Sequence, residues 1–78
     1  MAIKIISKTP ELIEDHTPTG VAMWYDRHLR MWCLYPVDAF GTQLAQARYA
    51  PRKDWARLIK KDIEEEIASG DREGWYYV

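Results

Sequence analysis

The segment from Pro51 to Gly70 restricts the fold of this chain most, because it predicts one long helix. Proline suits the first turn of a helix, where its missing N–H costs nothing, and glycine suits the residue just past the end. Between them, apolar residues recur every fourth position and so share one side of the helix. They are Trp55, Ile59, Ile63 and Ile67, with Leu58 beside them. One helix covers one face of a sheet, so a sheet formed by the rest of the chain has only one face covered by a helix.

Ahead of the helix, three apolar segments separated by turn residues predict an antiparallel meander. The segments are residues 21–25, 30–37 and 42–49. Between the last two, Asp38 and Gly41 stand at the first and fourth positions of a type I turn. We therefore expect one small α+β domain over residues 1–78, a three-stranded antiparallel meander followed by one C-terminal α-helix. Residues 2–7 and 75–78 are candidates for extra edge strands.

The predicted strands carry more apolar surface than one helix covers. Alternate residues of a strand point to opposite faces, yet both faces of the segment 30–37 are apolar. Met31, Cys33, Tyr35 and Val37 share one face, and Trp32 and Leu34 share the other. Either the N-terminal segment with Leu12 and Ile13 folds over the second face, or two copies pair through faces or edges, or the face is reserved for another protein. The sequence leaves open which face the helix covers.

Charge along the helix runs against the helix dipole, which favours acids in the first turn and bases in the last. Residues 51–61 hold five bases and one acid, a net of +4, and residues 62–78 hold one base and six acids, a net of −5. The five bases are Arg52, Lys53, Arg57, Lys60 and Lys61. One explanation is that the order of charges has drifted freely, because salt screens surface charge and makes it cost little. The other is that the two charged halves of the helix dock against complementary surfaces. Two antiparallel copies of the helix would set each basic half against an acidic half, as in a twofold dimer.

No constellation of catalytic or metal-binding residues is visible in the sequence. His16 and His28 lie in predicted loop and turn segments, and with the single cysteine they lack the paired spacing of a zinc site. Cys33 lies mid-strand among apolar residues, where a free cysteine is normally a small inert hydrophobe. No glycine-rich phosphate loop occurs. We expect no catalytic activity, no metal, no cofactor and no small-molecule substrate.

The pattern of the chain favours a cytoplasmic protein. One cysteine cannot form an internal disulfide, which suits a reducing compartment. The first residues lack a basic start followed by an apolar run, and no stretch approaches the roughly 20 apolar residues of a membrane span. We expect no association with a membrane.

Three strands followed by a helix resemble, in outline, the small arm-type DNA-binding domains at the start of some phage integrases. The resemblance runs from Gly20 to about Ile63, and it is carried by Trp24, the DAFG turn and the helix beyond. It implies a basic sheet face that reads DNA. The bases available here are Arg27, Arg30 and Arg48. Duplex binding would fall instead to the basic start of the helix, residues 52–61, against an overall charge of −1.

Aromatic residues make up 13% of the chain, and Trp and Tyr are enriched at the centres of protein interfaces. We therefore expect a non-catalytic protein-interaction module that binds another protein or itself as a homodimer, with a nucleic-acid-binding accessory protein as the alternative. The residues assigned to protein binding are Trp24, Trp32 and Leu34 on a sheet face and Trp75, Tyr76 and Tyr77 in the tail. The tail would pair with a strand edge. The five bases of the helix start would steer the encounter or contact nucleic acid.

Overall fold

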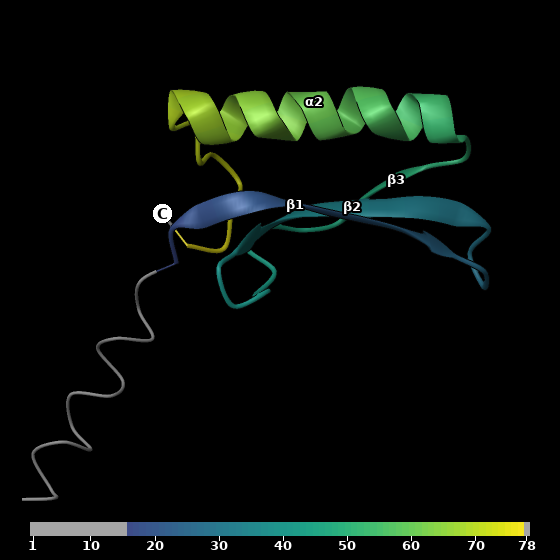
Figure 1. Cartoon of the computed structure of the whole chain (residues 1–78), viewed down its shortest axis with the longest axis horizontal. Coiled ribbons are helices and arrows are strands. Elements are labelled where there is room, and N and C mark those ends of the chain that lie inside the picture. The colour runs from purple at the N-terminus through teal and green to yellow at the C-terminus, as the bar shows by residue number, and fades with distance from the viewer. Residues whose placement is uncertain (1–15, 78) are drawn as a thin grey trace, which may run out of the picture.

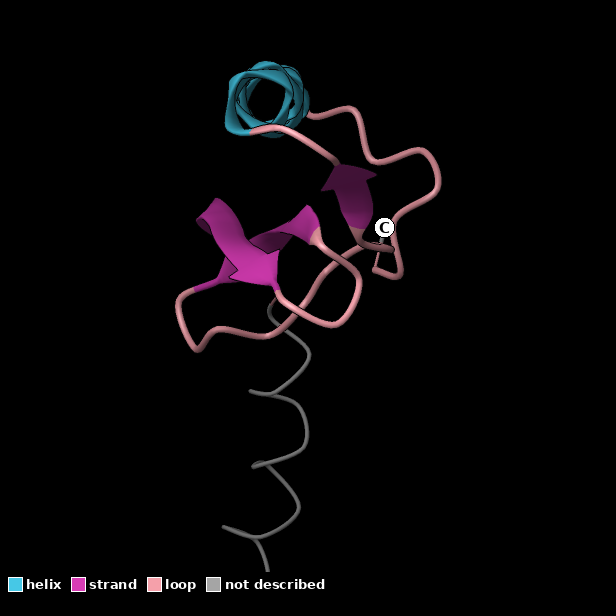
Figure 2. Ribbon diagram, turned by 90° about the vertical axis from the view of Figure 1, so that its right-hand side faces the viewer, coloured by secondary structure: helices cyan, strands magenta, loops and turns pink. Residues whose placement is uncertain are grey.

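The computed structural model describes residues 16–77 and confirms the α+β architecture. A three-stranded antiparallel sheet, in the order β1-β2-β3, lies under one helix, α2 (Figure 1). The elements are β1 Pro18–Asp26, β2 Met31–Asp38, β3 Arg48–Ala50 and α2 Lys53–Ser69. Seen along the helix, the molecule has two layers, with the helix on one side of the sheet (Figure 2). The candidate strand at 2–7 and the candidate cover from Leu12 and Ile13 lie outside the described residues.

Two tight turns connect the strands as the sequence predicts, and aspartates stabilise both. At the β1–β2 turn, Oδ1 of Asp26 accepts hydrogen bonds from the backbone N–H groups of His28 and Leu29 at 2.9 and 3.1 Å. After β2, the N–H of Gly41 donates to the carbonyl of Asp38 at 3.1 Å. Gly41 adopts a φ of 82°, which glycine reaches without steric cost. These turns set the antiparallel register of the sheet.

The third strand is much shorter than the segment 42–49 that the sequence predicts. Regular pairing with β2 covers only Arg48–Ala50, and before it single bridges form at Gln43 and Ala45. Leu44 and Ala45 in this segment are both buried. The bridge at Ala45 goes to Trp75, so this segment leaves β2 and pairs with the C-terminal tail instead.

The core lies between α2 and one face of the sheet. Its fully buried residues are Leu34, Ala50, Ala56 and Ile63, and partly buried Val21, Met23, Trp32, Ile59 and Ile67 pack against them. The helix therefore buries Ala56, Ile59, Ile63 and Ile67, not the predicted stripe that begins at Trp55. Trp55 and Leu58 are 51% and 64% exposed. A spacing of four advances 400° around a helix with 3.6 residues per turn, so a row of such residues slants by about 40° per step and leaves the covered side.

The two ends of α2 differ, since the C-terminal end has a capping hydrogen bond and the N-cap residue makes none with its side chain. Pro51 precedes the helix, which begins two residues later, and Arg52 occupies the N-cap with extended backbone angles. At the other end, Gly70 adopts the predicted left-handed conformation with φ 83°. Its N–H donates to the carbonyl of Glu66 at 3.0 Å. These contacts fix the direction in which the chain leaves the helix toward the tail.

The rotation of the helix leads to a prediction about stability. Ile63→Ala should lower the free energy of unfolding by about 2–5 kcal/mol, because Ile63 is fully buried and the substitution leaves a cavity. Leu58→Ala, one turn away on the exposed side, should change it by about 0.5 kcal/mol or less. Urea denaturation of both variants measures the difference. Equal losses would show that Leu58, not only Ile63, packs against the sheet.

Candidate interaction surface

The sheet has one face under α2 and one face that no described element covers. Val21, Met23, Trp32, Leu34 and Pro36 point to the helix, as the register of β1 and β2 and the core contacts require. The alternate residues point the other way. We call their side the open face, and its residues are Gly20, Ala22, Trp24, Asp26, Met31, Cys33, Tyr35, Val37 and Tyr49. From strand rise and spacing, β1 and β2 span about 26 Å by 10 Å, and the three residues of β3 bring the projected area to about 300 Å².

Three side chains form a row across the middle of the open face. Trp24 pairs with Cys33, and Cys33 pairs with Tyr49, so the row crosses all three strands. The outer two side chains are 44% and 48% exposed, whereas Cys33 between them is buried. Directly opposed residues bring their Cβ atoms to about 5 Å, so the small thiol lies between the two large side chains. The row is therefore two aromatic knobs with a shallow dip at the centre.

The same alternation of large and small continues along the strands. On β1, small Ala22 precedes large Trp24, and across from Ala22 stands the larger Tyr35. On β2, Met31 and Tyr35 flank Cys33. The open face thus carries a checkerboard of projecting and recessed side chains. Surfaces with this relief interdigitate when they pack.

The Cys33 thiol contributes shape to the open face and not reactivity. Burial raises its pKa, the negative charge of Asp26 raises it further, and a side-chain hydrogen bond with Tyr49 opposes part of this shift. A thiol with a raised pKa holds little of the nucleophilic thiolate at neutral pH. Cys33 is thus buried within the sheet.

One further aromatic side chain projects beside the open face. The turn after β2 hangs on the side of the sheet away from the helix (Figure 1). Phe40 stands in this turn and is 87% exposed, the largest exposure among the apolar side chains described. Its N–H is held by Oδ1 of Asp38 at 2.9 Å, so its position follows the turn. The sequence assigns Phe40 no role, and its place in a predicted turn is the one feature that indicates an exposed side chain.

The structure divides the residues that the sequence assigns to protein binding. Leu34 is 0% exposed under the helix, so its placement on an exposed face is wrong. Trp32 shares that covered face, partly buried. Trp75 is buried with Leu44 and Ala45. Of the six residues, Trp24 lies on the open face, and Tyr76 and Tyr77 are exposed in the tail. Alternation along the strand separates the two faces, but it does not say which one a helix covers.

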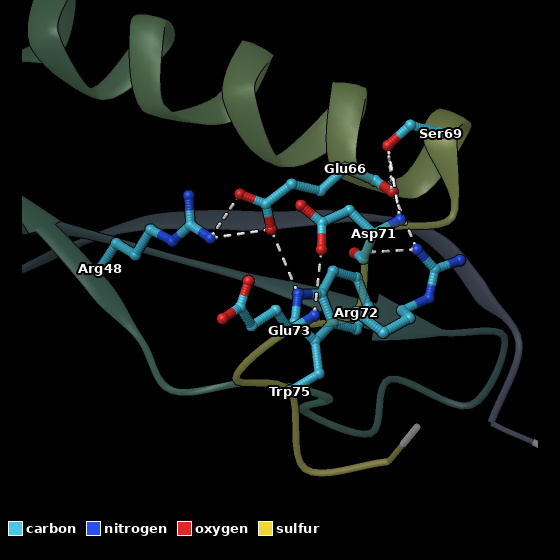
Figure 3. Close-up of polar contacts among 7 residues, drawn as sticks. All are labelled: Arg48, Glu66, Ser69, Asp71, Arg72, Glu73 and Trp75. Carbon is cyan, nitrogen blue, oxygen red and sulfur yellow. Dashed lines mark hydrogen bonds and ion pairs between the residues drawn. The ribbon is translucent and has the colours of Figure 1, made fainter.

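The tail is anchored by Glu66, near the end of α2 (Figure 3). The Glu66 carboxylate accepts two hydrogen bonds from Nη2 of Arg48 in β3, at 2.7 and 2.9 Å, and one from the indole Nε1 of Trp75 at 3.2 Å. The guanidinium of Arg72 donates to the Glu66 backbone carbonyl at 2.8 Å and lies 4.7 Å from the centre of the Trp75 ring. Glu66 therefore joins helix, sheet and tail. Part of the unusual charge order in α2 follows from this role.

The five bases of the helix start do not form one cluster. Arg52 pairs with Asp54 at 3.3 Å. Lys53, Arg57, Lys60 and Lys61 follow one side of α2 at helical spacing, and we call them the basic flank. Each residue of an α-helix is rotated by 100° from the one before it, which places the basic flank on the side opposite Glu66. Because Glu66 pairs with Arg48 of β3, the basic flank borders β1 at the other edge of the sheet. Lys53 supports this placement, since its Nζ lies 5.6 Å from the ring centre of Trp32, the cross-strand neighbour of Tyr25 in β1.

A second polar group holds the start of β1 near the tail. Oδ1 of buried Asp38 accepts from the N–H groups of Phe40 and Thr42, each at 2.9 Å, and its Oδ2 lies 3.3 Å from Nδ1 of His16. The His16 ring stacks on Tyr77 with centroids 3.8 Å apart. Burial alone would raise the pKa of Asp38, but the hydrogen bonds from Thr42, Phe40 and His16 outweigh it and hold the pKa below its ordinary value.

Across residues 16–77, no three histidine, cysteine or acidic side chains come together in a way that would hold a metal ion. Within the same range, no helix combines the length and apolar character needed to cross a bilayer. The features that remain are surfaces: the open face, the basic flank and the exposed edge of β1.

The Glu66 contacts predict a large difference between adjacent acids. Glu66→Ala should lower the free energy of unfolding by about 1–3 kcal/mol, because it leaves Arg48 and the Trp75 indole without their acceptor. Glu65→Ala, at an exposed neighbouring position, should change it by about 0.5 kcal/mol or less. Thermal and urea unfolding of both variants test this. Similar values for the two would mean that the Glu66 contacts add nothing in solution.

The lowered pKa of Asp38 predicts acid sensitivity. A carboxylate whose pKa is lower in the folded state stabilises the fold above its unfolded-state pKa, and this contribution is lost as the pH falls through the folded value. Asp38→Asn should therefore be less stable than the parent chain at neutral pH, and the difference should shrink toward about pH 2. Urea unfolding across this range provides the measurement. A difference independent of pH would contradict the prediction.

Comparisons with known proteins give no indication of function. No family model, no curated protein and no solved structure gives a significant match to this chain. The resemblance in outline to integrase arm-type domains thus receives no support from these comparisons. A functional proposal therefore rests on the open face, the basic flank and the edge of β1.

Proposed function

We propose that this protein is a non-catalytic protein-interaction module that self-associates through the open face of its sheet. The observation that carries the proposal is the row in which exposed Trp24 and Tyr49 flank the recessed Cys33. Tryptophan and tyrosine are the residues most enriched at the energetic centres of protein interfaces. Here they stand on a face that no described element covers.

The relief of the open face supports a second copy as its occupant. Under a twofold axis near Cys33, the Trp24 ring of one copy would enter the dip of the other, and the reverse contact would follow by symmetry. Two sheets packed this way lie about 10 Å apart, the spacing of a β-sandwich core. With Phe40 at the rim, each copy would bury about 400–600 Å², a small interface by the standards of stable complexes. We therefore expect a dimer of modest affinity.

The size of the domain also favours a partner. In the described chain, the main core holds four fully buried residues on one side of the sheet. Small single cores of this kind hold only roughly 3–5 kcal/mol, and association is one common supplement. A reducing cytoplasm is the compartment we propose, since the single cysteine, Cys33, has no disulfide role.

Nucleic-acid binding through the helix start is the alternative. Its support is the basic flank, four cations on one side of α2. Against it, the open face and the basic flank lie on different sides of the molecule, so the cations do not share a surface with the exposed rings of Trp24 and Tyr49. A labelled duplex titrated at low salt tests this alternative, and affinity that falls steeply with salt would favour it.

Self-association leads to a matched pair of variants. Sedimentation equilibrium of the parent chain over a hundredfold range of concentration should show a monomer–dimer equilibrium. Trp24→Ser should weaken the dimer by about 2 kcal/mol, roughly thirtyfold, because it removes the principal knob of the open face. Trp55→Ser, which removes a similarly exposed tryptophan from the helix, should leave the dimer unchanged.

Far-UV circular dichroism of both variants should match the parent chain, since each side chain is substantially exposed. The proposal fails if the parent chain stays monomeric throughout the range. It also fails if the two variants weaken association equally, since the open face would then have no special part in it.

A further inference from the structure

We infer a binding site for an extended acidic peptide along the free edge of β1. In the described sheet, β1 pairs with β2 on one side only, so alternate backbone N–H and C=O groups of its outer edge are available for a further strand. Strand addition to such an edge is an established mode of peptide recognition. This site is separate from the open face, and the inference does not rest on self-association.

The edge of β1 lacks most of the features that normally block strand addition. Proteins protect edges with charged side chains, prolines, bulges or short strands. β1 is nine residues long, and from Val21 to Tyr25 it carries no charged residue and no proline. Its one irregularity, a shift of register between Pro18 and Gly20, lies at the start of the strand. The remaining five residues form a regular edge.

The charge beside this edge specifies the ligand. The basic flank of α2 borders β1 on the helix side of the sheet, with Glu64 as the one acid on the same side of the helix. A strand added about 4.8 Å beyond β1 would place alternate side chains under Lys53, Arg57 and Lys60. Acidic side chains at those positions would pair with the cations.

The other side chains of the added strand would meet a different environment. They would lie beside Ala22 and Trp24 and extend the open face by one strand. Apolar side chains suit this side. The preferred ligand is therefore a segment in which acidic and apolar residues alternate, and the charge order of α2 places the required cations beside the edge.

Synthetic peptides test the inference on the full-length chain. The probe is a capped peptide of about eight residues that alternates glutamate and valine, matched to the length of β1. One control replaces glutamate by lysine, and the other keeps the composition but places all glutamates before all valines. Isothermal titration calorimetry gives the affinities, and amide chemical shifts of the labelled chain give the location.

We expect the alternating acidic peptide to bind at least about tenfold more tightly than either control and to shift the amides of Val21–Tyr25. Arg57→Gln with Lys60→Gln should weaken binding by about tenfold, whereas Arg52→Gln, on the same helix but off the basic flank, should change it less than about twofold. Raising the salt concentration should weaken the acidic peptide selectively.

Three results would overturn the inference. They are no binding of the alternating peptide, equal binding of the block-sequence control, and shifts confined to Cys33 and Tyr49 on the open face. An anionic oligonucleotide that binds the basic flank more tightly than the peptide, without shifting β1 amides, would assign the cations to nucleic acid instead. The proposed function is tested by sedimentation and this inference by peptide binding, so the two fail by different measurements.

Discussion

A single helix lying on a three-stranded sheet governs the rest of this structure, because it supplies one covering layer for two sheet faces. Leu34 and Ile63 are fully buried where the layers meet. The opposite face stays open in the described chain even though its residues are largely aromatic or aliphatic. In an antiparallel sheet, a face left to water normally carries polar side chains. The surplus of apolar surface is thus a direct result of how few elements the chain forms.

The architecture follows from local sequence signals, whereas the identity of the exposed residues does not. Apolar segments separated by turn residues, the spacing of apolar residues after Pro51 and the Gly70 cap are sufficient to predict three strands and a helix in order. The helix stripe was misassigned at Trp55, because fourfold spacing slants around the helix and Ala56 takes the buried place. Ala56 carries little hydrophobic signal of its own. Its burial depends on how closely the helix approaches the sheet, which is a tertiary property.

The sequence also does not determine which face of the sheet is covered. Alternation separates Trp32 and Leu34 from Cys33 and Tyr35, but the choice of covered face depends on the handedness of the connection from β3 to α2. The tail is a second case, since Trp75 is buried against Leu44 and Ala45, which lie about thirty residues earlier in the chain. No local pattern predicts a contact at that separation.

The reversed charge order of α2 has two parts with different explanations. At the acidic end, Glu66 accepts from Arg48 and Trp75, so one acid is retained for tertiary contacts despite the helix dipole. Arg72, just past the helix, donates to the Glu66 carbonyl and supplies the cation that the last turn lacks. At the basic end, the described chain provides only the Arg52–Asp54 pair and the position of Lys53 over Trp32. These two contacts do not involve Arg57, Lys60 or Lys61.

The alternation along β2 also has an evolutionary consequence. Positions 32, 34 and 36 face the helix, and positions 31, 33, 35 and 37 face outward. Neighbouring residues of one strand are therefore under different selection. Substitutions at the even positions are filtered by whether the chain folds at all. Substitutions at the odd positions change the open face, although the buried Cys33 among them also affects packing. The outward surface of such a strand can therefore change at every second residue, while the intervening residues preserve the scaffold.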